Sequence, residues 1–415
     1  MNAELKNFIA ACPTAFHTVF HTAEILKSRG FAELKEGELP EKNGKYFVTR
    51  NRSSLIAFKT GERLDSFMIT ASHGDSPAFK VKDNAVLAGE GLSRLSTERY
   101  GGMISYSWMD RPLSIAGRAV VRTENGVETR LVDFGKPVAV IPSVAPHLDF
   151  KCEFDAKTDM LPVFADGEGF TAALEAASGA KNADILSTDL FLYNPEPLCE
   201  MGELITAPRL DDLACAFTSL TAFLDAEPSG AAPVFCVFDN EEVGSTTKQG
   251  AASTFLFDTL DSIASAYGAN VVSVLRSSMM LSCDNAHAVH PNHPELADRN
   301  HQAKLGGGIV IKYNANQKYT SDAVSSGILK YILSRADVPY QLYANRADMR
   351  GGSTLGNIAN TSVSLNTADV GIAQLAMHSC LETQAAADTA NMVDALRAFY
   401  SARITMTADG EYRIK

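Results

Sequence analysis

The sequence predicts an α/β fold, in which helices sandwich a mixed, mostly parallel β-sheet and a β-rich domain is inserted into the chain. The 415-residue chain is longer than one ordinary hydrophobic core requires, so we expect two domains. From residue 186 onward, strand-like and helix-like apolar runs alternate, which is typical of a parallel sheet with helices on both faces. Residues 86–150 differ, because short strand-like runs follow one another there without a long helical pattern.

The N-terminal region is expected to contribute helices and strands to the larger domain. Apolar residues recur at helical spacing over residues 3–29, and Pro13 separates one helix from the next. Three strand-like runs follow: KYFVTR, SSLIAFKT and SFMITAS. We therefore expect His73, which follows the third run, at the end of a buried strand.

The middle of the chain is expected to form the inserted domain. Its short β-type segments are VLAGEGLSRLS, MISYSWMD, SIAGRAVVRT, VETRLVDF and VAVIPS, divided by Gly, Pro and Asn turns. Residues 151–185 are expected to form a loose junction. We therefore predict an inserted β-rich domain at residues 85–189 and a larger α/β domain built from residues 1–84 and 190–415.

The region after the insertion is expected to alternate strands with helices. The predicted strands are LFLYN, APVFCVFDN, SMMLSCDNA and GGIVIKYN. The predicted helices are residues 211–226, TFLFDTLDSIASAYG and VSSGILKYILSRA. Strands joined by helices pair in parallel, so the simplest arrangement is one sheet built from both ends of the chain.

Composition and charge argue against several classes of function. A formal net charge of −12 disfavours nucleic-acid binding, which needs a basic face. The sequence has no run of about 18 apolar residues and no signal-peptide pattern at its start, so we expect no membrane segment. Seven cysteines, an odd number without a CxxC motif, indicate free thiols in a reducing cytoplasm.

Four polar clusters each follow or interrupt an apolar strand-like run, which suits a site at the edge of a sheet. In ITASHGDSP, Asp75 is placed to accept a hydrogen bond from the second ring nitrogen of His73 when the first binds a metal. In TAPRLDDLACAF, Asp211 lies where a loop becomes an apolar helix. Asp211 is suited to capping that helix, although Asp212 is able to serve as the cap instead.

The other two clusters follow the strands VFCVF and MMLSC. The first continues into Glu241 and Glu242, and such a pair suits a division of labour in which one glutamate binds metal and the other activates water. A solvated turn is the alternative for this pair. The second continues into Asp284 and three histidines, but Pro291 and Pro294 prevent the helix that would align those histidines in one site.

Together these segments contain the ligands that a two-metal site requires. The candidate set is His73, Asp211, Glu242, Asp284 and His378, the last from IAQLAMHSCLET. Two metals that share one carboxylate each need one histidine and one further carboxylate. We predict two divalent metal ions per subunit, Zn²⁺ foremost, with Mn²⁺ or Co²⁺ as alternatives.

The same segments resemble those of a known enzyme family. SHGDSP, PRLDDL, DNEEVGS, DNAHAVHPN, KYNANQKYT and QLAMHS, together with CPTAFH and GGSTLG, are similar to signature segments of the aspartyl aminopeptidase family of metallopeptidases. They occur in the family's order and cover nearly the whole chain. The resemblance implies a zinc exopeptidase-like fold with an inserted dimerisation domain, and assembly from dimers into a dodecamer.

The resemblance also implies roles for single residues. It places the family's metal ligands at the five candidate positions, with Asp211 bridging the two ions. It places the general base at Glu241 and the residue that orients the first histidine at Asp75. His147, in IPSVAPHLDF, resembles a histidine that the inserted domain lends to the active site of a neighbouring subunit.

We therefore expect a cytoplasmic metallo-aminopeptidase that removes N-terminal residues, acidic ones above all, from peptides by attack of metal-activated water. By resemblance, Lys312 and Tyr319 bind the acidic side chain of the substrate. The alternative for Lys312 is a solvent-facing residue of a strand.

One competing function is a related zinc hydrolase: a broad or leucine-preferring aminopeptidase, a carboxypeptidase or a deacylase. Another is a non-catalytic assembly protein on a peptidase scaffold. The expected partners are peptides and further copies of the chain.

Overall fold

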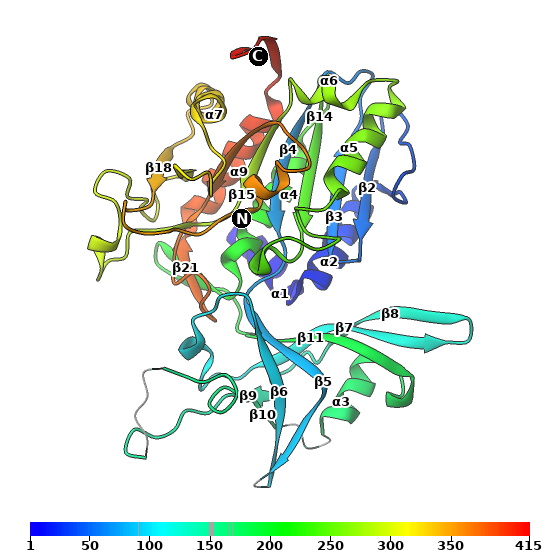
Figure 1. The fold of residues 1–415 in the computed structure, drawn as a ribbon, viewed down its shortest axis with the longest axis vertical. Helices are drawn as coiled ribbons and strands as arrows, with labels where there is room; N and C mark the ends of the chain where they lie inside the picture. The colour runs from blue at the N-terminus through cyan, green and yellow to red at the C-terminus, as the bar shows by residue number, and fades with distance from the viewer. Residues whose placement is uncertain (90, 149–152, 166, 168) are drawn as a thin grey trace.

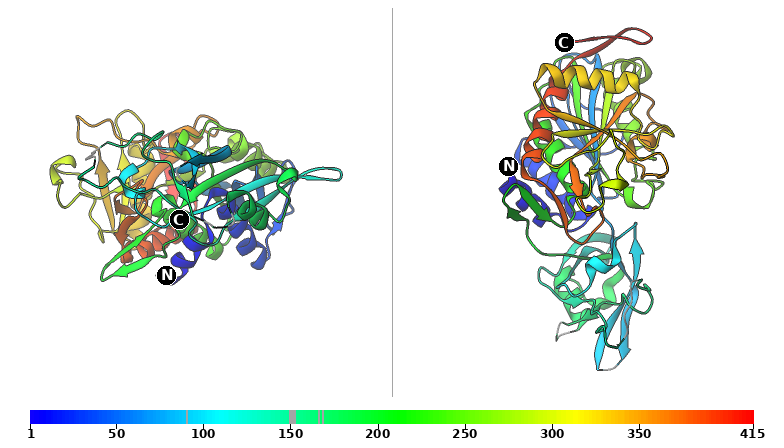
Figure 2. Two further views of the ribbon diagram at one scale, coloured as in Figure 1. Left: turned by 90° about the horizontal axis from the view of Figure 1, so that it is seen from below. Right: turned by 90° about the vertical axis from the view of Figure 1, so that its left-hand side faces the viewer.

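The chain folds into a larger and a smaller body that lie end to end (Figure 1). The computed structural model describes residues 1–89, 91–148, 153–165, 167 and 169–415. A nine-stranded sheet forms the centre of the larger body and a seven-stranded sheet that of the smaller one. Figure 2 shows from a second side that the two bodies follow one another along the long axis. The predicted α/β class with a β-rich part is confirmed.

The nine-stranded sheet is mixed. In spatial order it contains β1 (Ala32–Glu33), β2 (Lys45–Arg50), β3 (Ser54–Lys59), β14 (Ala231–Phe238), β4 (Ser66–His73), β15 (Met279–Cys283), β19 (Asn366–Gly371), β17 (Ile309–Tyr313) and β18 (Tyr340–Ala344). The central pairs β14–β4, β4–β15 and β15–β19 are parallel, whereas β3 and β17 run antiparallel to a neighbour. Strands β14, β4 and β15 are buried along their whole length because helices cover both faces.

Two hydrophobic cores lie on the two faces of this sheet. One face packs against α1 (Asn2–Ala11), α2 (Ala15–Ser28), α4 (Leu210–Asp225), α7 (Ala323–Arg335) and α9 (Ala386–Ser401). The other packs against α5 (Phe255–Ala266), α6 (Val271–Leu275) and α8 (Leu355–Ala359). Successive residues of β14 alternate between the cores: Phe235 and Val237 face the first, whereas Val234 and Cys236 face the second. The helices predicted on either side of Pro13 are confirmed as α1 and α2.

The seven-stranded sheet is antiparallel and lies in the part of the chain predicted as the insertion. Its spatial order is β8 (Gly126–Asp133), β7 (Ser114–Thr123), β11 (Ile185–Tyr193), β5 (Ala78–Gly89), β6 (Leu92–Tyr100), β10 (Val163–Phe164) and β9 (Ala139–Val140). The hairpin of β7 and β8 projects from the body (Figure 1). The predicted boundaries, at 84/85 and 189/190, both fall inside strands of this sheet, β5 and β11. The division into two domains itself stays a prediction.

Two local predictions for this region are wrong. MISYSWMD was expected to be β-type, but it contains the 3-10 helix η1 (Ser105–Trp108). A turn closes there because the N–H of Ser107 donates to the carbonyl of Ile104 over 3.1 Å, and the Trp108 ring packs edge-on against Phe79 at 5.5 Å. The segment expected as a loose junction contains α3 (Phe170–Ser178) and the 3-10 helix η2 (Asn182–Asp184).

The remaining elements are short. A five-stranded sheet contains β12 (Cys199–Met201), β13 (Leu204–Ala207), β21 (Glu382–Ala385), β20 (Ala373–Leu375) and β16 (Ala286–His287). The chain also forms β22 (Ile404–Ala408), β23 (Glu411–Ile414), η3 (Glu241–Val243) and η4 (Pro294–Leu296). Within the described residues, none of the helices is long and apolar enough to cross a bilayer.

The cysteines of the described residues are all free thiols. Cys12, Cys215, Cys236, Cys283 and Cys380 are buried, and Cys199 is exposed. Cys152 lies outside the described residues. Burial raises the pKa of the Cys12 and Cys236 thiols, so these side chains stay protonated and behave as small apolar groups.

Candidate metal centre

The candidate ligands come from elements that meet at one edge of the nine-stranded sheet. His73 is the last residue of β4, and Asp284 follows β15 directly. The two strands are parallel neighbours, so their carboxyl ends lie side by side. Glu242 lies in η3, just beyond the end of β14, and Asp211 lies at the start of α4. His378 lies in the loop between β20 and β21, with a positive φ of 67°.

The five side chains converge in space. Ligand atoms of His73, Asp211 and Asp284 lie within 4.8 Å of one another, and so do those of Asp211, Glu242 and His378. The two groups share Asp211, whose carboxylate oxygens lie 3.7 Å from Nε2 of His73 and 3.3 Å from Nε2 of His378. A third group joins Glu241 and Glu242 to His73.

The chemistry of these side chains fits zinc. Imidazole nitrogens and carboxylate oxygens are its ordinary ligands together with thiolates. Oδ1 of Asp211 and Oε1 of Glu242 are buried and have no hydrogen-bond partner among the described residues. A buried carboxylate oxygen without a partner is costly, and a bound cation removes that cost.

Burial and crowding raise the pKa of the acids in this cluster. Burial raises the pKa of Glu241 to about 8 and that of Glu242 well above its usual value. Burial alone would lower the pKa of the histidines, but hydrogen bonds to Asp75 and Asp211 outweigh it for His73 and His378, respectively. Protons held by these glutamates and histidines therefore offset part of the negative charge of the cluster. A divalent cation offsets that negative charge more completely.

Asp75 connects three parts of the centre. One carboxylate oxygen lies 3.5 Å from Nδ1 of His73, and the same ring nitrogen lies 3.1 Å from the Asp75 carbonyl. The backbone N–H groups of Glu241 and Glu242 donate to the two Asp75 oxygens, each over 3.2 Å. A single buried carboxylate therefore contacts the ring of a candidate ligand and holds the loop that carries both glutamates.

Neither aspartate at the start of α4 caps the helix. Its N-cap position is Arg209, which has a left-handed backbone and no capping hydrogen bond from its side chain. Asp211 points into the cluster, and Oδ2 of Asp212 accepts the backbone N–H of His73 over 3.2 Å. Both predicted capping roles are therefore wrong, because neither carboxylate accepts an N–H group from the first turn of α4: Asp211 faces the two histidines and Asp212 bonds to the end of β4.

Glu382 is a residue of this site that sequence analysis missed. It is 2% exposed at the start of β21, and it accepts the backbone N–H of His378 over 2.7 Å and that of Asp211 over 2.9 Å. Burial, followed by the charge of Asp211, raises its pKa to about 8. Its only sequence signal is proximity to His378, because a glutamate in SCLETQ carries no ligand pattern of its own.

The segment from Tyr100 to Ile104 is a second feature that sequence analysis missed. The Tyr100 hydroxyl donates to Asp75 over 2.7 Å and accepts from the Asn240 side chain over 2.9 Å. The N–H of Ile104 donates to the carbonyl of His378 over 3.0 Å. We call residues 100–104 the strap, because they tie the end of β6 in the smaller body to the metal centre.

Lys312 is buried rather than solvent-facing, so that alternative is wrong. It is 1% exposed on β17, and its ammonium donates to the carbonyls of Asp284 over 2.7 Å and Asn285 over 3.1 Å. The ammonium lies 3.5 Å from a carboxylate oxygen of Asp284 and 5.1 Å from the centre of the Tyr319 ring. Burial would lower the pKa of Lys312, but the charges of Asp284 and Asp369 outweigh it and keep the side chain cationic.

Among the remaining histidines, His147, His290 and His293 belong to none of the ligand groups of the described residues. His147 is exposed in the loop that follows β9, and the ligand groups of the described residues do not include it. His290 and His293 are also exposed, with ring centres 5.2 Å apart. That the three histidines after Asp284 do not form one metal site stays a prediction.

Comparison with known proteins places this geometry in a family. A family model described as "Aminopeptidase I zinc metalloprotease (M18)" matches residues 8–400. The chain belongs to the M18 family. It is 40% identical over 423 residues to "Probable M18 family aminopeptidase 2" of Clostridium acetobutylicum, with 96% of this chain and 98% of the relative covered.

Solved structures agree with the M18 assignment. The chain matches a structure of "the Ape4 and Nbr1 complex" with a TM-score of 0.91 and 31% identity, over 96% of this chain and 85% of the other. It matches a "mApe1 dodecamer" of S. cerevisiae with a TM-score of 0.86 and 26% identity, over 96% of both chains. M18 is the aspartyl aminopeptidase family, so the predicted family is confirmed and this M18 protein is a zinc metallo-aminopeptidase.

Proposed function

We propose that this M18 aminopeptidase holds two zinc ions and releases acidic residues from the N-termini of peptides in the cytoplasm. The strongest support is the geometry of Asp211, whose two carboxylate oxygens each lie near a different histidine. The two ligand groups share this one residue, as expected for a carboxylate that bridges two ions. His73 and Asp284 would hold one ion, and Glu242 and His378 the other.

Zinc bound at these ligands polarises a carbonyl group and lowers the pKa of a water molecule. Glu241 is suited to accept the proton of that water, because its carboxylate lies beside the ligands and its backbone is held by Asp75. Burial raises the pKa of Glu241 to about 8, so it is able to hold a proton and pass it to the leaving amine. Glu241 would thus act first as the general base and then as the general acid.

Lys312 and Tyr319 support the acidic preference. An ammonium has three N–H donors, and two of those on Lys312 are used by carbonyl oxygens. The positive charge beside the candidate ligand Asp284 favours a carboxylate side chain of the substrate over a neutral one. However, the 3.5 Å contact with Asp284 favours the alternative that Lys312 mainly supports a metal ligand, which would make the enzyme broad or leucine-preferring.

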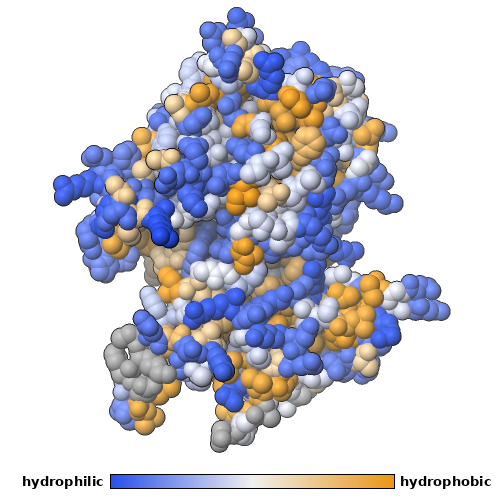
Figure 3. Space-filling view, viewed as in Figure 1, coloured by the Kyte–Doolittle hydropathy of each residue, from blue (hydrophilic) through white to orange (hydrophobic). Residues whose placement is uncertain are grey.

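We also propose that the smaller body mediates assembly from dimers into a dodecamer, and that His147 completes the active site of a neighbouring subunit. The "mApe1 dodecamer" is a match over 96% of this chain. Large apolar side chains are exposed on the smaller sheet, namely Val86, Leu92, Val127 and Leu186. Figure 3 shows an apolar patch on the smaller body near the β7–β8 hairpin, and such patches mark contact surfaces.

A panel of peptides that differ only in the first residue tests the proposed specificity. Asp against Asn and Glu against Gln separate the effect of charge from that of shape, and Leu represents the alternative. We expect kcat/KM to be at least about tenfold higher for Asp and Glu than for their amides, which corresponds to about 1.4 kcal/mol. Equal rates for the acids and amides, or faster cleavage of Leu, would reject the acidic preference.

A further inference from the structure

Lys312 has a second buried carboxylate beside it, in addition to that of the candidate ligand Asp284. On the paired strands β17 and β19, Lys312 lies directly opposite Asp369. Side chains at directly opposite positions of an antiparallel pair lie on the same face of the sheet, with Cβ atoms about 5 Å apart. Asp369 is 0% exposed, so little water screens its charge from the Lys312 ammonium.

Asp369 forms no direct ion pair with Lys312 among the described residues. The ammonium instead lies 3.5 Å from a carboxylate oxygen of Asp284 and donates to two carbonyl groups. One oxygen of Asp369 accepts the backbone N–H of Thr320, and the other accepts the hydroxyl of Thr354. Both donors are neutral, so they stabilise the ionised carboxylate and leave its negative charge in place.

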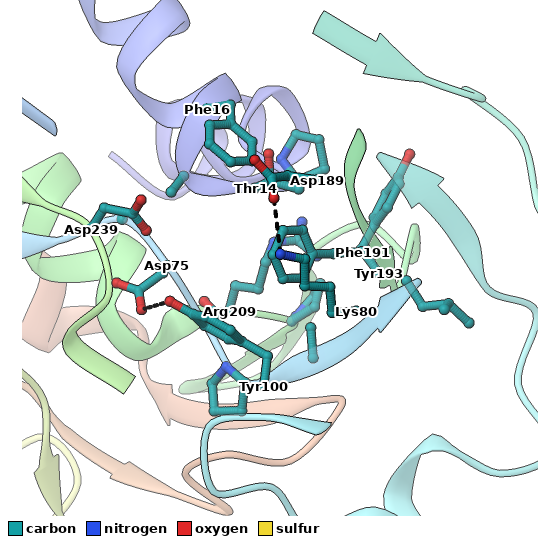
Figure 4. A pocket seen from close by; sticks show the side chains of 18 of the residues that line it. Thr14, Phe16, Asp75, Lys80, Tyr100, Asp189, Phe191, Tyr193, Arg209 and Asp239 are labelled. Atoms are coloured by element: carbon teal, nitrogen blue, oxygen red, sulfur yellow. Dashed lines mark hydrogen bonds and ion pairs between the residues drawn. The ribbon is translucent and has the colours of Figure 1, made fainter. Parts of the chain in front are cut away.

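Asp75 is held by similar donors at the metal centre. It accepts the Tyr100 hydroxyl, as the dashed line in Figure 4 shows, and the backbone N–H of Glu241. Asp75 also lies 3.5 Å from the ring of the candidate ligand His73, whereas Asp369 belongs to no ligand group of the described residues. The same kind of support therefore holds one carboxylate against the metal centre and another against Lys312.

Asp284 and Asp369 both act electrostatically on Lys312. Burial would lower the pKa of Lys312, and the charges of Asp284 and then Asp369 outweigh that effect. A cation held by Asp284 offsets the charge of that ligand, but the charge of Asp369 stays opposed to Lys312. A substrate carboxylate near Lys312 would then be attracted by the ammonium and repelled by Asp369.

We propose that Asp369 is a specificity-determining residue: it weakens the attraction of Lys312 for an acidic substrate side chain, and so sets how strongly acidic N-termini are preferred over neutral ones. This inference rests on the proposed function, because it takes Lys312 as the residue that meets the substrate side chain. Removal of the Asp369 carboxylate should therefore increase the preference for acids. A purely structural role would instead slow acidic and neutral substrates alike.

Asp369→Asn tests the proposal, because asparagine keeps the shape of the side chain and removes its charge. Its carbonyl oxygen is able to accept from Thr320, and its NH₂ group is able to donate to the Thr354 hydroxyl. The zinc-loaded full-length variant is assayed with peptides that begin with Asp, Asn, Glu or Gln. We expect the Asp:Asn and Glu:Gln ratios of kcat/KM to rise at least about fivefold over wild type. Ratios that stay at the wild-type value or fall, in a folded variant that holds zinc, would overturn the proposal.

Asp337→Asn is the matched control. Asp337 is exposed in the turn before β18, and its left-handed φ of 54° is one that asparagine also adopts. The substitution removes the same charge at the surface, where water and salt screen it, so both ratios should stay at the wild-type value. An equal rise in the two variants would count against the proposal, because net charge rather than the position of Asp369 would then control the preference.

Thr354→Val decides the question should Asp369→Asn fail to fold or to hold zinc, as judged by circular dichroism and zinc content. The substitution removes the hydroxyl that donates to Asp369 and keeps the carboxylate, which then repels a substrate acid more strongly. Both ratios are expected to fall at least about twofold. Unchanged or higher ratios in this variant would overturn the proposal.

The wild-type ratios separate this inference from the proposed function. Wild-type ratios close to unity reject the acidic preference, and a rise in Asp369→Asn then still supports the role of Asp369. High wild-type ratios that Asp369→Asn leaves unchanged support the acidic preference and overturn the role of Asp369.

Discussion

At the residue scale, the metal centre brings together several carboxylates whose burial is costly unless positive charge lies nearby. Asp211 is the clearest case, because it is 3% exposed and both of its oxygens face histidines. Those histidines lower its pKa against the effect of burial, so it remains ionised and able to bind a cation. Glu241 differs, since burial raises its pKa to about 8. One environment thus favours the charged form of Asp211, a candidate ligand, and the protonated form of Glu241, the proposed general base.

Glu241→Gln is expected to lower kcat by about 10²–10⁴-fold, because glutamine keeps the shape of the side chain but cannot accept a proton. Zinc content, measured by atomic absorption, is expected to stay at the wild-type level. Glu200→Gln, at an exposed position of β12, serves as the control and should leave kcat unchanged. A Glu241→Gln variant with near wild-type turnover would contradict the role of general base.

Lys312→Met is expected to reduce kcat/KM for Asp and Glu substrates at least about tenfold more than for a Leu substrate, because it removes the buried charge and keeps the apolar stem. Lys318→Met removes an exposed lysine of the same segment and is the matched control. Loss of zinc in Lys312→Met would instead show that the ammonium mainly supports Asp284, to whose carbonyl it donates over 2.7 Å. Equal losses for all substrates would remove Lys312 from the specificity pocket.

At the element scale, the strap brings the smaller body into contact with the metal centre. Tyr100 bonds to Asp75, Ile104 bonds to His378, and Gly101 lies against Glu242. A Cβ atom on Gly101 would lie 3.0 Å from Cβ of Glu242 and 3.3 Å from its carbonyl oxygen. The close approach of the strap therefore requires glycine at this position.

Gly101→Ala is expected to lower kcat by roughly ten- to hundredfold, because a displacement of Glu242 by a fraction of an ångström misplaces a zinc ligand. Gly91→Ala is the matched control: Gly91 has a φ of 76° beside 73° for Gly101, but a Cβ there meets no atom within 4 Å. Both variants carry the same left-handed strain, so their difference isolates the contact with Glu242. Equal activity in the two variants would show that the strap does not position the ligand.

At the scale of the whole molecule, the buried acids link stability to metal and pH. Burial raises the pKa of both Glu241 and Glu382 to about 8 from the ordinary value of 4.5. Between those two values the folded protein holds protons that the unfolded chain has lost, so stability falls as pH rises. The raised pKa of His378, about 10, acts in the same direction above the ordinary value of 6.5.

Removal of zinc with EDTA is therefore expected to lower Tm, and to lower it by more degrees at pH 8 than at pH 5.5. Differential scanning calorimetry with and without added Zn²⁺ measures both effects. The zinc-free protein itself should lose several degrees between the two pH values. A Tm of the zinc-free protein that rises with pH would contradict the crowding of buried acids.

Mixed oligomers test the proposed role of His147 in a neighbouring subunit. His147→Ala subunits keep Glu241, and Glu241→Gln subunits keep His147, so neither homo-oligomer should have much activity. Co-expression is expected to restore part of it, because some sites then combine an intact Glu241 with a histidine from the neighbouring subunit. No recovery in zinc-loaded mixed oligomers would contradict a role across the interface.

The α/β class and the strand ends that carry His73 and Asp284 could be predicted from the sequence. Apolar periodicity follows from burial, and parallel strands necessarily bring their carboxyl ends together. The break at Pro13 and most of the strand–helix alternation predicted from residue 186 onward are of this kind. The placement of LFLYN in the larger domain was wrong, because its first four residues belong to β11, which pairs with β5 and β7 in the seven-stranded sheet. Motif order also identified the family, because the motif residues must recur wherever the same ligands are required.

Contacts between segments that are distant in the chain could be decided only by the tertiary structure. Glu382 and the strap support the metal centre through backbone hydrogen bonds, which any amide group is able to make and which leave no residue pattern. Residue types and local periodicity determine which side chains are able to bind metal or transfer protons. The packing of the two bodies determines which other groups hold those side chains in place.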